Sequence, residues 1–239
     1  RLMHAAILLA GGKGRRMGPS IQDKLLHPIG SSNAFRLSSE AFLKASSIDA
    51  FLIVFRDSSQ KEKLQNEFAI ASENVGRQAD PVMVKGGLER KDSVSNALSA
   101  CDQACEFVHV HDCARPMIRP ETINQLAKQV CQTGAVIVAR PMKDTVKKAL
   151  DPSLPSDTPQ NTESVDRSSL WLMETPQVTR KEWLGNGLQK AEELGLVVTD
   201  ELSALELTNR KTTFLDPKYP NPKITTSSDL SYVEYLLNQ

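Results

Sequence analysis

This 239-residue chain has four cysteines, 5% aromatic residues and no formal net charge. Four cysteines without paired spacing exclude a disulfide-rich scaffold and favour a reducing compartment, so we expect a cytoplasmic protein, or one of the chloroplast stroma if it is a trimmed plant protein. With 29 basic and 29 acidic residues, the chain lacks the net positive charge typical of proteins that bind nucleic acids or membrane surfaces. No apolar run approaches the roughly 18 residues of a membrane-spanning helix, and the first residues lack the layout of a signal peptide. We therefore expect no nucleic-acid partner and no membrane partner.

Short apolar runs alternate with amphipathic stretches along the first 140 residues. The runs are typical of buried strands, and the stretches repeat apolar residues at helical spacing. Continuous apolar strands alternating with helices predict an α/β fold, with a mainly parallel sheet and helices on both faces. The expected strands are 5–10, 51–55, 81–84, 107–110 and 135–139; the expected helices are 33–46, one capped by Ser58 or Ser59, 92–104, and one with Pro120 in its first turn.

This alternation breaks after Asp144. Residues 151–164 are rich in proline, serine, threonine and aspartate and show no apolar periodicity, which is typical of a functional or disordered insertion. The pattern resumes near residue 169, and we expect one domain over residues 1–239 with an excursion at about 143–170. Beyond it we expect a helix with a capping box of Thr179 and Glu182 that Gly195 ends, a short helix after Thr199, a strand at 212–215, and a last helix capped by Ser227 or Ser228.

The first expected strand leads into the segment L-L-A-G-G-K-G-R-R-M-G. Glycines at 11, 12 and 14 let the backbone approach a ligand closely, and nearby arginines and lysines add positive charge, as binding of a triphosphate requires. The P-loop pattern fails because Arg15 and Arg16 follow Gly14. The dinucleotide pattern G-x-G-x-x-G fails at Met17, which makes a NAD-dependent oxidoreductase a poor alternative. The segment thus favours triphosphate binding by another kind of site.

An ordered set of motifs carries a resemblance that covers nearly the whole chain. The glycine-rich segment resembles the signature of nucleotidyltransferases that bind a nucleoside triphosphate on a Rossmann-like sheet. The full set resembles the 2-C-methyl-D-erythritol 4-phosphate cytidylyltransferases of the non-mevalonate isoprenoid pathway. The further motifs are G-G-L-E-R-K-D-S-V (86–94), V-H-D-C-A-R-P (110–116), P-M-K-D-T-V-K (141–147), V-D-R-S-S-L-W (165–171), T-P-Q (175–177), T-D-E-L-S-A-L-E (199–206) and P-K-I-T-T-S-S-D-L (222–230).

The resemblance implies a reaction and a mechanism. The phosphate of a polyol phosphate attacks the α-phosphorus of CTP and pyrophosphate leaves, giving a CDP-polyol for isoprenoid precursor synthesis. A phosphate monoester is mostly a dianion near neutral pH and is already a nucleophile. Catalysis then depends on positioning, cationic side chains and Mg²⁺ rather than on a general base.

The resemblance also implies site residues. Arg16 and Lys24 would stabilise the charge that develops at the α-phosphate, and Asp112 would contact both the nucleotide and Mg²⁺. Ser93 has a second interpretation as a helix cap, and Glu89 with Arg90 is expected to pair locally. Residues implied to bind CTP are Ala10, Gly11, Gly12, Gly14, Gly87, Leu88, Ser93, Asp112 and Cys113; those implied to bind the polyol phosphate are Thr145, Arg167, Thr175, Thr199 and Lys223.

The excursion has a further implied role. In the family it is a protruding β-arm exchanged between subunits, so the resemblance implies a homodimer whose sites are completed in trans. Thr145 and Arg167 lie on this arm, and residues 151–164 would form its tip.

Two other functions stay open on the sequence, and a metal site is conceivable but not favoured. A ribitol 5-phosphate cytidylyltransferase shares most of the motifs, and a non-catalytic nucleotide-binding module could have the same fold. His109, His111 and Cys113 share one face of an extended segment, which makes a zinc site conceivable. Cys101 and Cys105 fit the core stripe of a helix, however, so we expect packed thiols.

Overall fold

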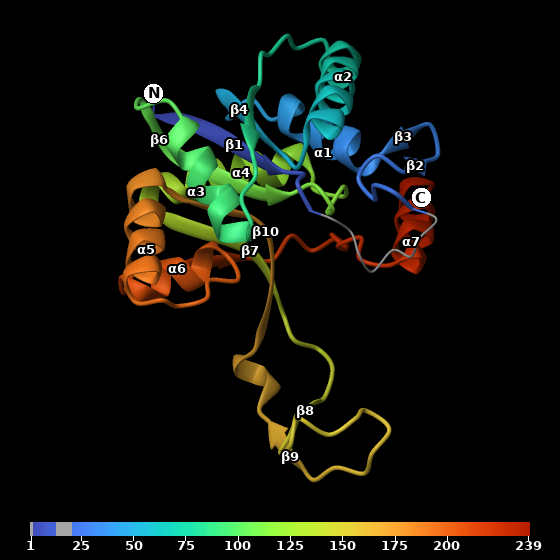
Figure 1. Cartoon of the computed structure of the whole chain (residues 1–239), viewed down its shortest axis with the longest axis vertical. Coiled ribbons are helices and arrows are strands. Elements are labelled where there is room, and N and C mark those ends of the chain that lie inside the picture. Colours follow the sequence, from blue (N-terminus) through green and yellow to red (C-terminus); the bar gives the residue numbers. More distant parts are fainter. Residues whose placement is uncertain (1, 13–20) are drawn as a thin grey trace.

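The structure, a computed structural model, describes residues 2–12 and 21–239; Gly14 and Arg16, predicted to bind CTP and to act in catalysis, lie outside the described residues. Its centre is a seven-stranded sheet with the order β11-β7-β10-β6-β1-β4-β5. β10 runs antiparallel to both of its neighbours, and the other pairs are parallel. The predicted α/β class and mainly parallel sheet are therefore confirmed (Figure 1). The strands are β1 (Met3–Leu9), β4 (Ala50–Phe55), β5 (Val82–Lys85), β6 (Cys105–Asp112), β7 (Ala135–Pro141), β10 (Trp171–Arg180) and β11 (Thr213–Leu215).

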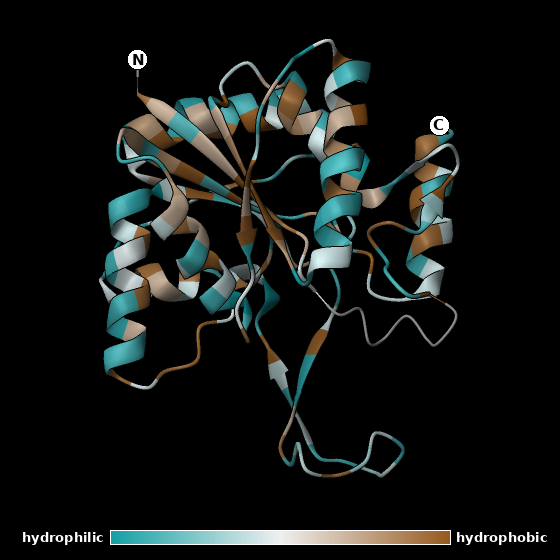
Figure 2. Cartoon of the chain, turned by 45° about the horizontal axis from the view of Figure 1, so that its top comes forward, coloured by the Kyte–Doolittle hydropathy of each residue, from teal (hydrophilic) through white to brown (hydrophobic). Residues whose placement is uncertain are grey.

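Helices cover both faces of this sheet, because alternate residues of its strands point to opposite sides. In β1, Ala6 and Leu8 belong to one buried cluster, while Ala5 and Ile7 belong to another. The apolar strands accordingly lie between amphipathic helices (Figure 2). The helices are α1 (Ala34–Lys44), α2 (Ser58–Val75), α3 (Arg90–Ala100), α4 (Pro120–Thr133), α5 (Lys181–Glu193), α6 (Glu201–Leu207) and α7 (Ser227–Leu237), and a small hairpin joins β2 (Pro28–Ile29) to β3 (Ser32–Asn33).

A hairpin arm leaves the sheet between β7 and β10 and extends away from it (Figure 1). It contains β8 (Val146–Ala149), β9 (Thr162–Val165) and the 3₁₀ helix η2 (Arg167–Ser169). The backbone N–H of Met142 donates to the Leu170 carbonyl over 2.9 Å and closes its base. Most of its residues are exposed. The prediction that residues 151–164 lack regular structure is wrong at its end, because β9 pairs with β8 there.

Four predicted boundaries are also wrong. Asp57, not Ser58 or Ser59, caps α2, and Thr226, not Ser227 or Ser228, caps α7. In each case the residue just before the predicted cap also has a side-chain oxygen that reaches the first free N–H groups. Thr179 forms no capping box: it is buried in β10 and donates to the Gly134 carbonyl over 3.2 Å, so α5 begins only at Lys181. α3 ends at Ala100, which places Cys105 at the start of β6.

Candidate active site

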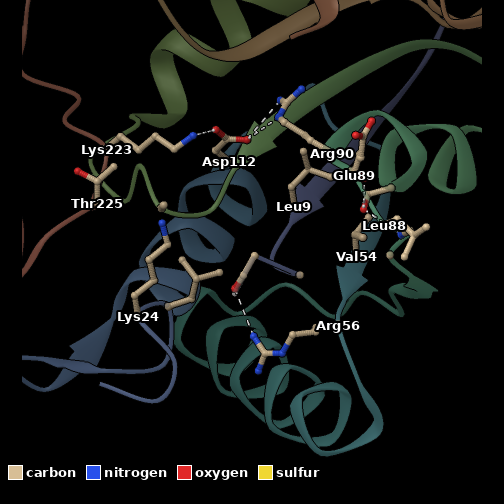
Figure 3. A pocket seen from close by; sticks show the side chains of 17 residues that line it. Leu9, Lys24, Val54, Arg56, Leu88, Glu89, Arg90, Asp112, Lys223 and Thr225 are labelled. Atoms are coloured by element: carbon tan, nitrogen blue, oxygen red, sulfur yellow. Dashed lines mark hydrogen bonds and ion pairs between the residues drawn. The ribbon is translucent and has the colours of Figure 1, made fainter. Parts of the chain in front are cut away.

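A pocket of about 820 Å³ opens at the carboxyl ends of β1, β4 and β6. β1 lies between the other two strands: the chain runs from β1 to β4 and β5 on one side and then crosses to β6 on the other, and open α/β sheets bind ligands at such a point. Among neutral residues, its wall carries four basic side chains and two carboxylates, one largely buried (Asp112) and one exposed (Glu89) (Figure 3). The lining residues are Leu9, Gly11, Gly12, Lys24, Leu25, Val54, Arg56, Gly86, Gly87, Leu88, Glu89, Arg90, Ser93, Asp112, Ala114, Lys223 and Thr225.

The loop after β5 forms one wall through its backbone. A Cβ added to Gly87 would lie 2.2 Å from Cβ of Asp92, so only glycine fits here. The N–H of Gly87 donates to Ser93 Oγ over 3.1 Å, and this hydroxyl lies 3.2 Å from the Glu89 carbonyl, to which it donates. Glu89 and Asp92 form the capping box of α3. Ser93 therefore lines the pocket and also stabilises the loop through its hydroxyl. The side chain of Leu88 is fully exposed at the rim of the pocket.

Four side chains of alternating charge run from the protein interior to the pocket. Glu201 binds Arg90 in a bidentate pair with distances of 2.6 and 3.0 Å. Arg90 lies 3.3 Å from Asp112 Oδ1, and Lys223 pairs with Oδ2 of the same carboxylate from the other side (Figure 3). Glu89 pairs instead with Lys91 at 3.6 Å, so the predicted local pair of Glu89 with Arg90 is wrong. Only the tertiary fold brings these four groups together.

Burial and neighbouring positive charges shift the pKa values of the Asp112 and Glu201 carboxyl groups in opposite directions. Burial raises the pKa of the Asp112 carboxyl, but the positive charges of Arg90 and Lys223 outweigh it and hold that pKa far below its usual range. For Glu201, burial raises the pKa more than Arg90 lowers it. Asp112 is therefore an anion at neutral pH and cannot serve there as a proton donor.

His111 and Thr175 support Asp112 from behind. The hydroxyl of Thr175 accepts from the backbone N–H of Asp112 over 3.1 Å and lies 3.0 Å from His111 Nδ1. His111 Nε2 lies 3.2 Å from the Arg115 carbonyl, which can only accept, so this nitrogen carries the proton and Nδ1 accepts from Thr175. Burial lowers the pKa of His111 to about 3, consistent with this neutral ring.

The segment before α7 closes the pocket opposite the loop after β5. Lys24 Nζ donates to the Ile224 carbonyl over 2.8 Å, and the N–H of Ile224 donates to Ala114 over 2.8 Å. Arg115 donates to the Asn221 carbonyl over 2.8 Å. Arg115 thus holds the segment that carries Lys223.

The structure brings some of the predicted residues together and separates others. Lining the pocket are Gly11, Gly12, Lys24, Gly87, Leu88, Ser93, Asp112 and Lys223. Ala10, Cys113 and Thr175 are buried and outside the lining, and Thr199 lies just before the N-cap of α6, with its hydroxyl 3.3 Å from that of Ser203. Thr145 and Arg167 are exposed on the arm, where Arg167 donates to the Lys143 carbonyl over 2.6 Å.

The cysteine and histidine side chains of the discounted zinc interpretation are packed instead. Cys101 and Cys105 belong to a buried apolar cluster, and His109 is fully buried, with His4 Nδ1 3.0 Å from its Nε2. In residues 2–12 and 21–239, three or more histidine, cysteine or acidic side chains nowhere gather closely enough to hold a metal ion. Over the same residues, no helix has both the length and the apolar character needed to cross a membrane.

Sequence reasoning missed Arg56, Arg90 and Glu201. Arg56 directly follows the apolar run of β4, as Asp112 ends β6, so its position at the carboxyl end of a strand was a usable signal. For Glu201 no local signal exists, because its partner Arg90 lies 111 residues earlier.

A pocket with basic side chains at the carboxyl edge of a mainly parallel sheet, beside a glycine-rich turn after the first strand, is the arrangement in which Rossmann-like folds bind nucleotides. The family model described as "IspD: 2-C-methyl-D-erythritol 4-phosphate cytidylyltransferase" matches residues 4–239, and the chain belongs to this family.

Similar proteins agree with this assignment. The 2-C-methyl-D-erythritol 4-phosphate cytidylyltransferase of Shouchella clausii is 33% identical over 99% of this chain and 97% of its own. The chloroplastic enzyme of that name from rice is 33% identical over 98% of this chain and 74% of its own. Among solved structures, the Francisella tularensis enzyme is 25% identical, with a TM-score of 0.77 over 98% of this chain and 99% of that one. A 4-diphosphocytidyl-2C-methyl-D-erythritol synthase from Anaerococcus prevotii shares the fold, with a TM-score of 0.80 at 24% identity over 99% of this chain and 96% of that one.

Proposed function

We propose that this protein transfers CMP from CTP to 2-C-methyl-D-erythritol 4-phosphate. An oxygen of the polyol phosphate attacks the α-phosphorus, the bond from that phosphorus to the bridging oxygen breaks, and pyrophosphate leaves. The observation that carries this proposal is the pocket wall itself, where four basic side chains, Lys24, Arg56, Arg90 and Lys223, face one cavity and Arg90 and Lys223 pair with the largely buried carboxylate of Asp112. Two anionic substrates need such a wall, because their mutual repulsion opposes the reaction.

The reaction needs no proton-abstracting residue. The attacking phosphate is mostly a dianion near pH 7. Lys24, with Arg16 as its expected partner, stabilises the charge that builds on the α-phosphoryl oxygens. Backbone groups at Gly11, Gly12 and Gly87 accommodate the nucleotide, and Ser93 braces the loop that faces the base.

Lys223 exchanges partners when the second substrate binds. Its ammonium pairs with Asp112 in the described structure. A phosphate dianion in the pocket competes with Asp112 for this ammonium, because its oxygens can accept two charge-assisted hydrogen bonds from Lys223. Arg90 remains bound to Asp112 and Glu201, so the carboxylate keeps one partner when Lys223 moves to the phosphate.

Asp112 also suits Mg²⁺. This ion takes one or two carboxylates together with phosphate oxygens and water, and each Asp112 oxygen has a second lone pair beside its ion-pair contact. Mg²⁺ bound with CTP supplies further neutralisation of the triphosphate charge. Asp112 would hold it, and Lys24 and Lys223 act on the phosphates around it.

The arm supplies Thr145 and Arg167 to the pocket of a partner subunit in a homodimer. Both residues lie on a hairpin that extends away from the sheet of its own chain (Figure 1).

A test of this exchange mixes two inactive variants, Lys24→Ala and Arg167→Ala. Exchange of arms predicts restored activity, because a mixed dimer contains one intact pocket facing one intact arm. No restoration in mixed dimers, verified by two affinity tags, would contradict the exchange.

The decisive assay measures pyrophosphate release from CTP and Mg²⁺ with each of two polyol phosphates. Preference for 2-C-methyl-D-erythritol 4-phosphate supports the proposal, and preference for ribitol 5-phosphate would replace its substrate. CTP binding without pyrophosphate release from either would indicate a non-catalytic module. We propose that the protein lies in the cytoplasm, or in the chloroplast stroma if it comes from a plant, as for the rice relative named chloroplastic. Localising a tagged protein in its source cells tests this.

A further inference from the structure

Gln60, in the first turn of α2, has a buried side chain whose polar atoms are all used. Its Oε1 accepts from the backbone N–H of Arg56 over 2.7 Å. Its Nε2 donates to the Ala10 carbonyl over 3.0 Å and to Asp23 Oδ2 over 2.7 Å. One amide thus ties the turn after β4 to the turn after β1 and to the residue before Lys24.

Asp23 receives three donors. Its Oδ1 accepts from the N–H of Leu25 over 3.0 Å, and its Oδ2 accepts from Gln60 and, over 3.4 Å, from Arg56 Nη2. Only 12% of the Asp23 side chain is exposed. A largely buried carboxylate is stable when donors and an opposite charge surround it, which holds its backbone in place.

Arg56 completes this group. Its Nη1 donates to the Gly12 carbonyl over 3.2 Å (Figure 3), and its Nε donates to Asp57 over 2.8 Å. Asp23, Arg56 and Gln60, which we name the clasp, therefore bind the chain at residues 10 and 12 on one side and at residue 23 on the other. These two segments carry Gly11, Gly12 and Lys24 into the pocket wall.

We infer that the clasp positions Lys24 relative to the Gly11–Gly12 turn, with Gln60 as its central residue. Gln60 and Asp23 do not line the pocket, so they act through the residues that do. Within the clasp, Arg56 also pairs with the Asp23 carboxylate. This pairing weakens the attraction between that carboxylate and the neighbouring ammonium of Lys24. Because phosphoryl transfer depends on placing cations to within a fraction of an ångström, a loosened Lys24 lowers the rate without a matching loss of substrate affinity.

This inference rests on the proposed function, and its test compares Gln60→Leu with Gln65→Leu, an exposed glutamine of the same helix. We expect Gln60→Leu to lower kcat roughly 10- to 100-fold, with the KM for the polyol phosphate within about twofold. Gln65→Leu should match the wild type. Amide hydrogen exchange measured on the same proteins should be faster in residues 9–12 and 21–26 of Gln60→Leu.

Each outcome decides the inference. Unchanged kcat, or unchanged exchange in both segments, would overturn it. If Gln60→Leu does not fold, Asp23→Asn replaces it, since that change keeps the side-chain shape and removes the charge from the clasp. If the wild type releases no pyrophosphate, the proposed function fails, and hydrogen exchange alone still tests the clasp.

Discussion

The carboxylate of Asp112 and the ammonium of Lys223 form an ion pair across the pocket, between the end of β6 and the segment before α7. The two residues are 111 positions apart in the chain. This pair holds the Lys223 ammonium at the pocket wall, where the proposed function has it bind the polyol phosphate.

Replacing Lys223 tests this role. Lys223→Ala should raise the KM for the polyol phosphate about 10- to 100-fold, the loss of one charge-assisted contact of about 1.5–3 kcal/mol. Affinity for CTP, measured by calorimetry, should change less than about threefold, because Lys223 is proposed to contact the polyol phosphate and Arg90 still pairs with Asp112. Lys211→Ala, an exposed lysine on the way to β11, is the control. Equal losses for both substrates would contradict a role specific to the polyol phosphate.

The Glu201–Arg90 pair predicts a stability effect. Glu201→Gln should lower the free energy of unfolding by about 3 kcal/mol, because it leaves the mostly buried charge of Arg90 with one partner fewer. Glu206→Gln, on an exposed position of α6, should change it by less than about 0.5 kcal/mol. Urea denaturation of both variants measures the difference. A loss no larger than that of the control would show that the pair does not stabilise the fold.

His111 predicts a dependence of stability on pH. Its folded-state pKa is lowered to about 3 by burial, whereas an unfolded histidine titrates near 6.5. Between these values the unfolded chain binds a proton that the folded chain excludes. Stability should therefore fall as pH drops below about 6.5, by about 1.4 kcal/mol per pH unit from this residue. Urea denaturation of wild type and His111→Gln between pH 4.5 and 7.5, a range spanning the unfolded value, should show a shallower slope in the variant; identical slopes would contradict the assignment.

Gly87 predicts a steric effect on nucleotide binding. Gly87→Ala places a Cβ against Asp92 and must displace the loop. We expect CTP affinity to fall at least about tenfold, or 1.4 kcal/mol. Gly185→Ala in α5 meets no atom within 4 Å and should leave affinity unchanged. Unaltered CTP binding in Gly87→Ala would remove this loop from the proposed site.

Much of this fold is predictable from the sequence because buried parallel strands are continuous apolar runs. The strands at Ala5–Ala10 and Ala135–Ala139 can be predicted without knowledge of the tertiary structure. β10 was missed as a long antiparallel strand because Glu174, Thr175 and Gln177 look polar, although their side chains are buried by contacts with distant residues such as Asn221 and Asp200.

The site also consists of residues that sequence motifs predict and of ion pairs that only the tertiary structure reveals. Gly87, Asp112 and Lys223 lie in motifs that the sequence displays, and the fold brings them to one pocket. The ion pairs of Arg90 with Glu201 and of Arg56 with Asp23 depend on how α3, α6 and α2 pack. No local pattern encodes such distances. Thr175, a motif residue implied to bind the polyol phosphate, is buried outside the pocket lining, and its hydroxyl contacts His111 and the N–H of Asp112.

The central claim is that a cationic pocket at the carboxyl edge of the sheet aligns two anionic substrates. The most direct test is a crystal structure with CTP and Mg²⁺. We predict the triphosphate between the Gly11–Gly12 turn and Lys24, with the base against the loop at Gly87. A nucleotide bound elsewhere, with Lys24 and Asp112 untouched, would contradict the account.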